Sequence, residues 1–194
     1  PIVMYCPTAM DGNMRVVPYR TRSPGWAFQI EMAIADVFRD FPDIQCVFKL
    51  HTSSIYCPVS PIVSYLHDEQ IANCIVLNAS FTSVMSMADM FITDYPSTSF
   101  LEMLVTNQPI LVCGHLLPFP FGGKWHPSRL EMWIERVKYR DSLQEFTDLL
   151  GETLRECDFA PFIGKDKMLH QFGTHLGDGH SAERAANKIC EIVG

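Results

Sequence analysis

Residues 88–106 read ADMFITDYPSTSFLEMLVT, and this stretch decides the fold. An apolar run ends at Asp94, a Tyr-Pro-Ser-Thr turn follows, and residues 99–106 have the apolar spacing of a helix. A buried strand that passes through a short turn into a helix is the repeating unit of a parallel α/β sheet. The stretch therefore predicts one such unit, with polar residues at the point where its strand ends.

The same order of strand and helix recurs along the whole chain. We predict strands over Ile2–Cys6, Ile44–Leu50, Cys74–Leu77, Met90–Asp94, Pro109–Cys113 and 136–139. We predict helices over Trp26–Phe38, Pro61–Gln70, Phe81–Ala88, Ser99–Thr106, 142–157 and 181–193, with a short further helix before residue 136. Because the strands are almost wholly apolar, helices must cover both faces. The prediction is a Rossmann-like, doubly wound parallel sheet that forms a single domain over residues 1–194.

Composition narrows the possible functions. Hydrophobic residues make up 47% and charged residues 19%, which indicates a packed core rather than disorder. The net charge is −7 and no basic run occurs, so we expect no nucleic-acid partner. The seven cysteines lack CxxC spacing and indicate reduced thiols in a cytoplasmic protein. No apolar stretch reaches the roughly 18 residues of a membrane span.

Parallel α/β sheets bind ligands at the carboxyl ends of their strands. The segments predicted at that edge are Thr8–Met10, His51–Ser54, Asp94–Ser99 and the residues from Gly114 onward. The amides and hydroxyls of Ser97, Thr98 and Ser99 open a helix there, which favours an anion such as a diphosphate. The alternative is ordinary N-capping, since Ser and Thr are common at helix starts.

Two further side chains at this edge are candidates. Glu102 lies one turn into the helix, where it either completes a capping box or accepts hydrogen bonds from a ribose diol. His51 ends a strand and acts as a general base, as a cation beside a phosphate, or only structurally. The sequence contains no Gly-x-Gly-x-x-Gly, Walker A or Gly-x-Ser-x-Gly motif, which disfavours NAD enzymes, P-loop NTPases and α/β-hydrolases.

Other patterns are weaker. His170, His175 and His180 recur every five residues, a spacing that does not share one helical face, so we predict no metal site. The segment 119–125 combines aromatic residues with Gly122 and Gly123, as in a mobile flap or a plain connecting loop. The chain begins at Pro1, directly within a predicted strand, and we expect it to be part of a longer protein.

Four motifs in order resemble the CDP-glycerol glycerophosphotransferase (teichoic acid polymerase-like) family. They are VMYCPT at 3–8, similar to that family's ILYAPT; FKLH at 48–51, with its strand-ending histidine; ITDYPSTS at 92–99, similar to ITDYSS; and DGHSAER at 178–184, similar to DGKASER. The resemblance implies the C-terminal, donor-binding half of a GT-B fold, with the N-terminal domain outside this chain. It also implies a catalytic or phosphate-binding His51 and diphosphate contacts from Ser97 and Thr98, with Thr8, Asp94 and Ser99 in the same diphosphate site.

Residues 98–109 also resemble the GGxQEEAxxxGKPV helix of UDP-N-acetylglucosamine 2-epimerases, which implies that Glu102 binds the ribose. The chain departs from the main family at two places. Ala9 and Met10 replace an aromatic-Arg pair, which leaves the donor unidentified, and Pro96 replaces a serine, which removes a hydroxyl and an amide donor.

The functional hypothesis is transfer from a CDP- or UDP-activated donor to a polymer or lipid-linked acceptor, with the nucleotide-activated donor as substrate and no separate cofactor. The resemblance implies that the full-length enzyme works at the cytoplasmic face of the cell membrane and that this domain alone is incomplete. Whether phosphorus or an anomeric carbon is attacked stays open. The alternatives are a sugar-nucleotide 2-epimerase and a non-catalytic nucleotide-binding or assembly module.

Overall fold

The computed structural model describes residues 1–7, 24–50, 61–94, 98–113, 127–140, 142–164, 166–173 and 178–193. Within these ranges the strands are β1 (Ile2–Cys6), β2 (Gln45–Lys49), β3 (Cys74–Leu77), β4 (Met90–Thr93), β5 (Ile110–Cys113) and β6 (Lys138–Arg140). The helices are α1 (Pro24–Phe38), α2 (Pro61–Asp68), α3 (Phe81–Val84), α4 (Thr98–Val105), α5 (Pro127–Arg136), α6 (Leu143–Glu156) and α7 (Ser181–Val193). A 3-10 turn, η2 (Met85–Met87), follows α3, and a π-helical turn, η3 (Leu169–Gly173), precedes α7.

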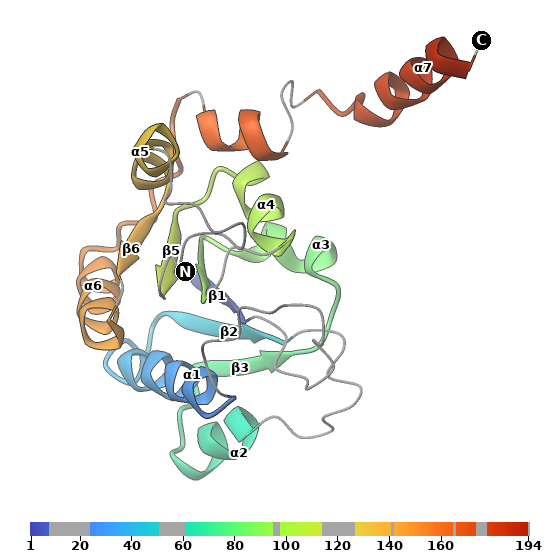
Figure 1. The fold of residues 1–194 in the computed structure, drawn as a ribbon. Coiled ribbons are helices and arrows are strands. Elements are labelled where there is room, and N and C mark those ends of the chain that lie inside the picture. Colours follow the sequence, from blue (N-terminus) through green and yellow to red (C-terminus); the bar gives the residue numbers. More distant parts are fainter. Residues whose placement is uncertain are drawn as a thin grey trace.

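The strands form one parallel sheet in the order β3-β2-β1-β4-β5-β6. The chain winds outward from β1 to β3, returns to place β4 beside β1, and then winds outward in the other direction to β6 (Figure 1). This topology confirms the doubly wound, Rossmann-like sheet that the sequence predicts. The strand order reverses between β1 and β4, which is where ligand crevices form in such sheets.

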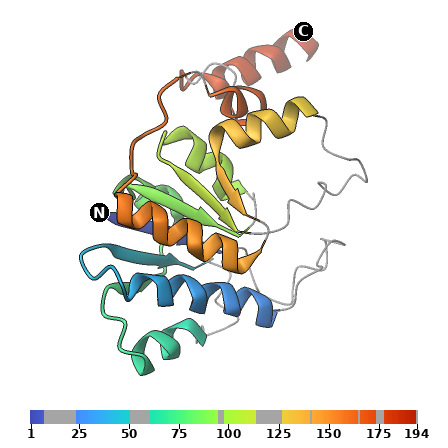
Figure 2. The same ribbon diagram turned by 90° about the vertical axis from the view of Figure 1, so that its left-hand side faces the viewer.

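The two faces of the sheet pack into separate cores because successive strand residues point to opposite sides. On β1, Val3 and Tyr5 join the first core, which contains the buried side chains of α1, α2 and α6. Met4 and Cys6 join the second core, which contains those of α3, α4 and α5. Figure 2 shows α1 and α6 side by side along one face of the sheet. The near-continuous apolar strands are thus explained by burial on both faces.

Helix bounds follow from local chemistry. On α1, Ile30, Ile34 and Phe38 are fully buried at intervals of four residues, the spacing of one helical face. On α6, the Ser142 side chain accepts a hydrogen bond from the Glu145 amide (3.2 Å), and Cys157 ends the helix in the left-handed conformation. The buried stripe of α1 and the Ser142 cap of α6 make these two helices predictable from sequence.

Some bounds differ from the sequence predictions. β4 ends at Thr93 and α4 begins at Thr98, one residue earlier at each point. Arg136 belongs to α5, and the last strand covers Lys138–Arg140 instead of 136–139. The turn η3 was not predicted. Among the helices that the structure describes, none has the length and apolar character needed to cross a bilayer.

Candidate functional site

The candidate site lies at the carboxyl ends of β1 and β4, where the strand order reverses. Cys6 and Thr93 are register partners there, and the Thr93 hydroxyl donates a hydrogen bond to the Cys6 carbonyl oxygen (3.2 Å). Asp94 follows directly and is buried. Helix α4 then begins at Thr98, so its N-terminus belongs to the same edge of the sheet. Because the first amides of a helix have no intrahelical partner, this end favours a negatively charged group.

A buried acidic group lies on the α1 side of this edge. Glu31 falls on the inward stripe of α1 beside Ile30 and is only 1% exposed. Neither of its carboxyl oxygens, nor the hydroxyl of the fully buried Tyr5, hydrogen-bonds to any residue that the structure describes. Burial, reinforced by the charge of Asp94, raises the pKa of Glu31 to about 8. Glu31 is therefore mainly a neutral carboxylic acid at neutral pH.

Tyr5 and Asp94 belong to the same group. Burial raises the pKa of the Tyr5 phenol well above 10, and the charges of Asp94 and Glu31 add to the effect. The Tyr5 ring packs edge-on against Phe48 at 5.7 Å between centroids, which fixes its position beneath the strand ends. Among the described residues, this side of the site is thus uncharged apart from Asp94, and it offers hydroxyl and carboxyl protons rather than cations.

The α4 side of the edge has a different character. Lys49 is the last residue of β2 and is 7% exposed, and its charge acts on the neighbouring Cys6. Burial is the main reason that the pKa of the Cys6 thiol is raised to about 12. The charge of Lys49 opposes this shift, and the charges of Asp94 and Glu102 add to it. Cys6 therefore stays protonated at neutral pH and is not a thiolate nucleophile. What remains available for chemistry here is a cation, the hydroxyls at the start of α4, and the Glu102 carboxylate.

The structure brings four of the predicted site residues to this edge. Asp94 is buried, Thr98 is exposed in the first turn of α4, and Ser99 and Glu102 are half-buried. Thr8, His51 and Ser97 lie outside the described residues, as do His175 and the segment 119–125. In the part of the chain that the structure describes, no three His, Cys, Asp or Glu side chains come together as a metal site.

Three residues of the site were not found from the sequence: Tyr5, Glu31 and Lys49. Tyr5 and Glu31 were hidden within an apolar strand and a helical stripe. Lys49 did leave a signal, because a lysine within the run Val47-Phe48-Lys49-Leu50 interrupts a strand that is otherwise buried. A charged residue at the end of a core strand is uncommon and suggests a role beyond packing.

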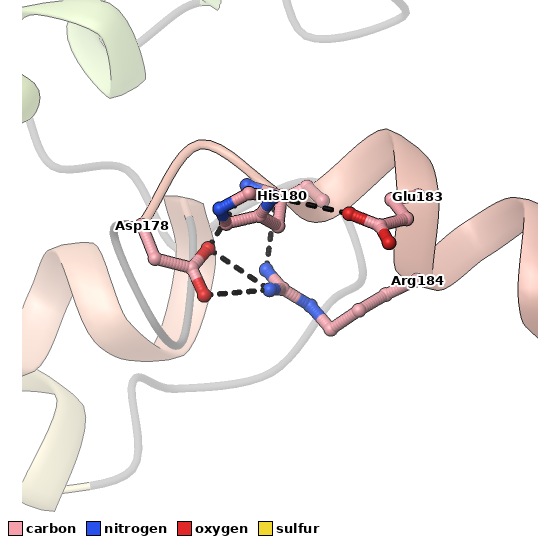
Figure 3. Close-up of polar contacts among 5 residues, drawn as sticks. Asp178, His180, Glu183 and Arg184 are labelled. Carbon is pink, nitrogen blue, oxygen red and sulfur yellow. Dashed lines mark hydrogen bonds and ion pairs between the residues drawn. The ribbon is translucent and has the colours of Figure 1, made fainter.

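The DGHSAER segment forms a helix cap (Figure 3). Asp178 accepts hydrogen bonds from the His180 amide (3.0 Å) and from Arg184 (2.8 and 2.9 Å). His180 in turn contacts Glu183 (3.1 Å), and Arg184 contacts the Ser181 hydroxyl (3.1 Å). These exposed side chains bind one another at the start of α7, which extends away from the sheet in Figure 1. Their visible role is to begin that helix.

A second depression lies at the opposite, amino-terminal edge of the sheet, and its lining includes Arg39, Glu69 and Asn73. Arg39 is ion-paired with Glu69 (2.8 Å) and with Asp36 (3.1 Å). The Asn73 amide donates hydrogen bonds to three backbone carbonyls. Arg39, Glu69 and Asn73 thus bind groups within the chain, which indicates that these three side chains have a structural role.

The chain matches no protein-family model and no curated protein. What can be stated is the class of fold, a doubly wound α/β sheet, together with a polar site at its point of strand reversal.

Proposed function

We propose that this chain binds the nucleotide end of an activated donor, as the donor-binding domain of a transferase similar to the CDP-glycerol glycerophosphotransferases. One observation carries the proposal: α4 begins with Thr98 and Ser99 at the carboxyl edge of the sheet, where the strand order reverses between β1 and β4. Helix starts at this point of a doubly wound sheet favour phosphate, because unpaired amides and the helix dipole both attract negative charge.

In this proposal the donor is CDP- or UDP-linked, and its transferable group passes to a hydroxyl of a cell-surface polymer or a lipid-linked acceptor. Negative charge develops on the departing nucleotide phosphate, and the start of α4 stabilises it. Glu102 accepts hydrogen bonds from the ribose hydroxyls, and His51 acts as base or phosphate cation. A second GT-B domain completes the cleft, and the full-length enzyme acts at the cytoplasmic membrane surface. Phosphoglycerol and glycosyl transfer both fit this arrangement.

Isothermal titration calorimetry with CDP, UDP and GDP tests the binding step. We expect CDP or UDP to bind, and Glu102→Ala to weaken that binding by about tenfold through loss of the ribose contact. The matched ligand is the 2′,3′-dideoxynucleotide, which lacks both ribose hydroxyls and should bind the native chain and Glu102→Ala almost equally. A folded chain that binds none of the three nucleotides would refute the proposal.

Turnover by the full-length protein separates the remaining functions. A transferase needs an acceptor, whereas a 2-epimerase interconverts a UDP-sugar without one. A non-catalytic module binds nucleotide without turning it over. Full turnover by a His51→Ala protein would contradict the catalytic role of His51.

A further inference from the structure

Lys49 is a lysine whose side chain is largely buried at the end of β2. It is 7% exposed, and no acidic side chain in the described part of the chain lies within ion-pair distance of its ammonium. Arg136 is the other buried cation of the described residues, and it is ion-paired with Asp166. A largely buried lysine at the end of a core strand, with no acidic partner among the described residues, is positioned to receive its counter-charge from a ligand.

The sheet places Lys49 at the candidate site. Tyr5 is the register partner of Phe48, so Lys49 lies beside Cys6 at the next position along the two strands. Cys6 in turn pairs with Thr93 on β4. Strand alternation puts Lys49 on the same face as Val47, the face covered by α3 and α4. Lys49, Cys6 and Thr93 thus form a row across the reversal point on the α4 side of the sheet.

The charges around this row show what kind of ligand fits. Lys49 lowers and Glu102 raises the pKa of the Cys6 thiol, and no ion pair joins these two described residues. The α4 N-terminus adds partial positive charge to the same side. On the α1 side, by contrast, the buried ionisable groups are Asp94 and the neutral acid Glu31, and no buried cation of the described residues is present. An anionic group is therefore favoured beside Lys49 and the start of α4 rather than on the α1 side.

We propose that Lys49 binds a phosphoryl group of the ligand, between the end of β2 and the start of α4, and that this phosphate supplies its missing counter-charge. The inference rests on the proposed nucleotide-binding function and adds a residue and an orientation to it. The diphosphate lies at the start of α4 beside Lys49, and the ribose hydroxyls lie toward Glu102, one turn further along the same helix.

The test is calorimetry with CDP and, separately, with inorganic pyrophosphate. We compare the native chain with Lys49→Met, which keeps length but removes charge, and with Lys49→Arg, which keeps charge. Lys188→Met, on the exposed face of α7, is the control. We expect Lys49→Met to lose about tenfold or more in affinity for both ligands, Lys49→Arg to lose less, and Lys188→Met to bind normally.

A thermal melt of each ligand-free variant separates binding from folding. Since Lys49 has no ion pair with a described residue for Lys49→Met to break, the melting temperature of this variant should match that of the native chain. If Lys49→Met fails to fold, Lys49→Gln carries the same binding test.

The possible results distinguish the two proposals. Normal CDP binding by Lys49→Met, or equal losses in Lys49→Met and Lys49→Arg, would overturn the role of Lys49 and leave the proposed function standing. A third result is that the native chain binds pyrophosphate but no nucleotide, and that Lys49→Met no longer binds pyrophosphate. The phosphate-binding role of Lys49 then holds, and the proposed nucleotide-binding function is refuted. If the native chain binds neither ligand, both proposals fail.

Discussion

Glu31 is the residue through which we expect pH to act on stability. The pKa of its carboxyl is about 8 in the folded chain, against an ordinary value of 4.5. As pH rises from about 4.5 to about 8, the unfolded chain loses this proton and the folded chain keeps it, so the free energy of unfolding falls. The largest slope from this one group is about 1.4 kcal/mol per pH unit. Urea unfolding across this pH range measures it.

Glu31→Gln is the matched variant, because glutamine has nearly the same shape and does not ionise. The native chain and Glu31→Gln should have similar stability at acidic pH and diverge as pH rises, with the variant more stable at about pH 8. If the free energies of unfolding of the two proteins instead run parallel over the whole pH range, Glu31 has the same pKa in the folded and the unfolded chain. That result would contradict the burial of Glu31 as a neutral acid.

At this scale the sequence predicted the residues that follow a recognisable pattern. Asp94, Thr98, Ser99 and Glu102 could be placed because a strand, a turn and a helix follow one another in a single stretch. Glu31 could not be placed, because its environment depends on Asp94, which is distant in sequence. Side chains that meet only across the fold carry no local signal of that meeting.

At the scale of elements, Arg136 links α5 to the segment before η3. Its side chain is 2% exposed, is ion-paired with Asp166, donates to the Gln108 carbonyl (3.1 Å) and lies 5.0 Å from the centre of the Phe162 ring. Asp166 also accepts the Leu169 amide (2.7 Å). We expect Arg136→Met to lower the free energy of unfolding by about 3 kcal/mol or more, because Asp166 is left buried and unpaired. Urea unfolding measures this loss.

Lys138→Met is the control for that prediction, since its ion pair with Asp158 is about 40% exposed on both sides. It should cost about 1 kcal/mol or less. The double variant Arg136→Met with Asp166→Asn should lose less than the sum of its single changes. Equal losses at Arg136 and Lys138 would contradict the buried link.

Asp178 controls the start of α7. The backbone amide of His180, followed by Arg184, holds the pKa of the Asp178 carboxyl below its usual value. The cap is therefore fully present at pH values above the usual pKa of an aspartic acid, and it is lost as the pH falls through the lowered pKa of Asp178. We expect the Asp178→Ala variant to lack this cap at neutral pH. Amide hydrogen exchange should then be faster at Arg184, whose amide donates a hydrogen bond to the His180 carbonyl oxygen (3.0 Å).

The rest of the molecule should not respond to this change, because no α7 residue that the structure describes is buried. The melting temperature of Asp178→Ala should match that of the native chain. Glu191→Gln, which affects only an exposed pair later in the helix, should leave exchange at Arg184 unchanged. Native exchange rates at Arg184 in Asp178→Ala would contradict the capping role.

Elements were predictable in proportion to their length and local pattern. β3 and α7 match their predicted bounds, and α6 is fixed by the Ser142 cap. The turn η3 escaped prediction because it covers five residues and is held by tertiary contacts, including the packing of Leu169 in the second core. Short elements of this kind depend on neighbours that a local pattern cannot reveal.

At the scale of the whole molecule, buried apolar strands that alternate with helices were enough to predict a doubly wound sheet. They also predicted that Asp94, Thr98 and Ser99 lie at the carboxyl edge of the sheet, which is the edge where doubly wound folds generally bind ligands. They could not predict that a lysine lies on the α4 side of that edge and a buried, neutral glutamic acid on the α1 side. This difference between the two sides arises from Lys49 and Glu31, whose burial depends on the packed helices.

The most direct test of the account is a crystal structure of this chain with CDP bound. We predict the diphosphate at the carboxyl edge between β1 and β4, with its oxygens at the start of α4 and within hydrogen-bond distance of Lys49, and the ribose next to Glu102. A nucleotide bound instead in the depression near Arg39 and Asn73, or at the reversal point with its base toward α4 and its phosphates toward Glu31, would contradict the account.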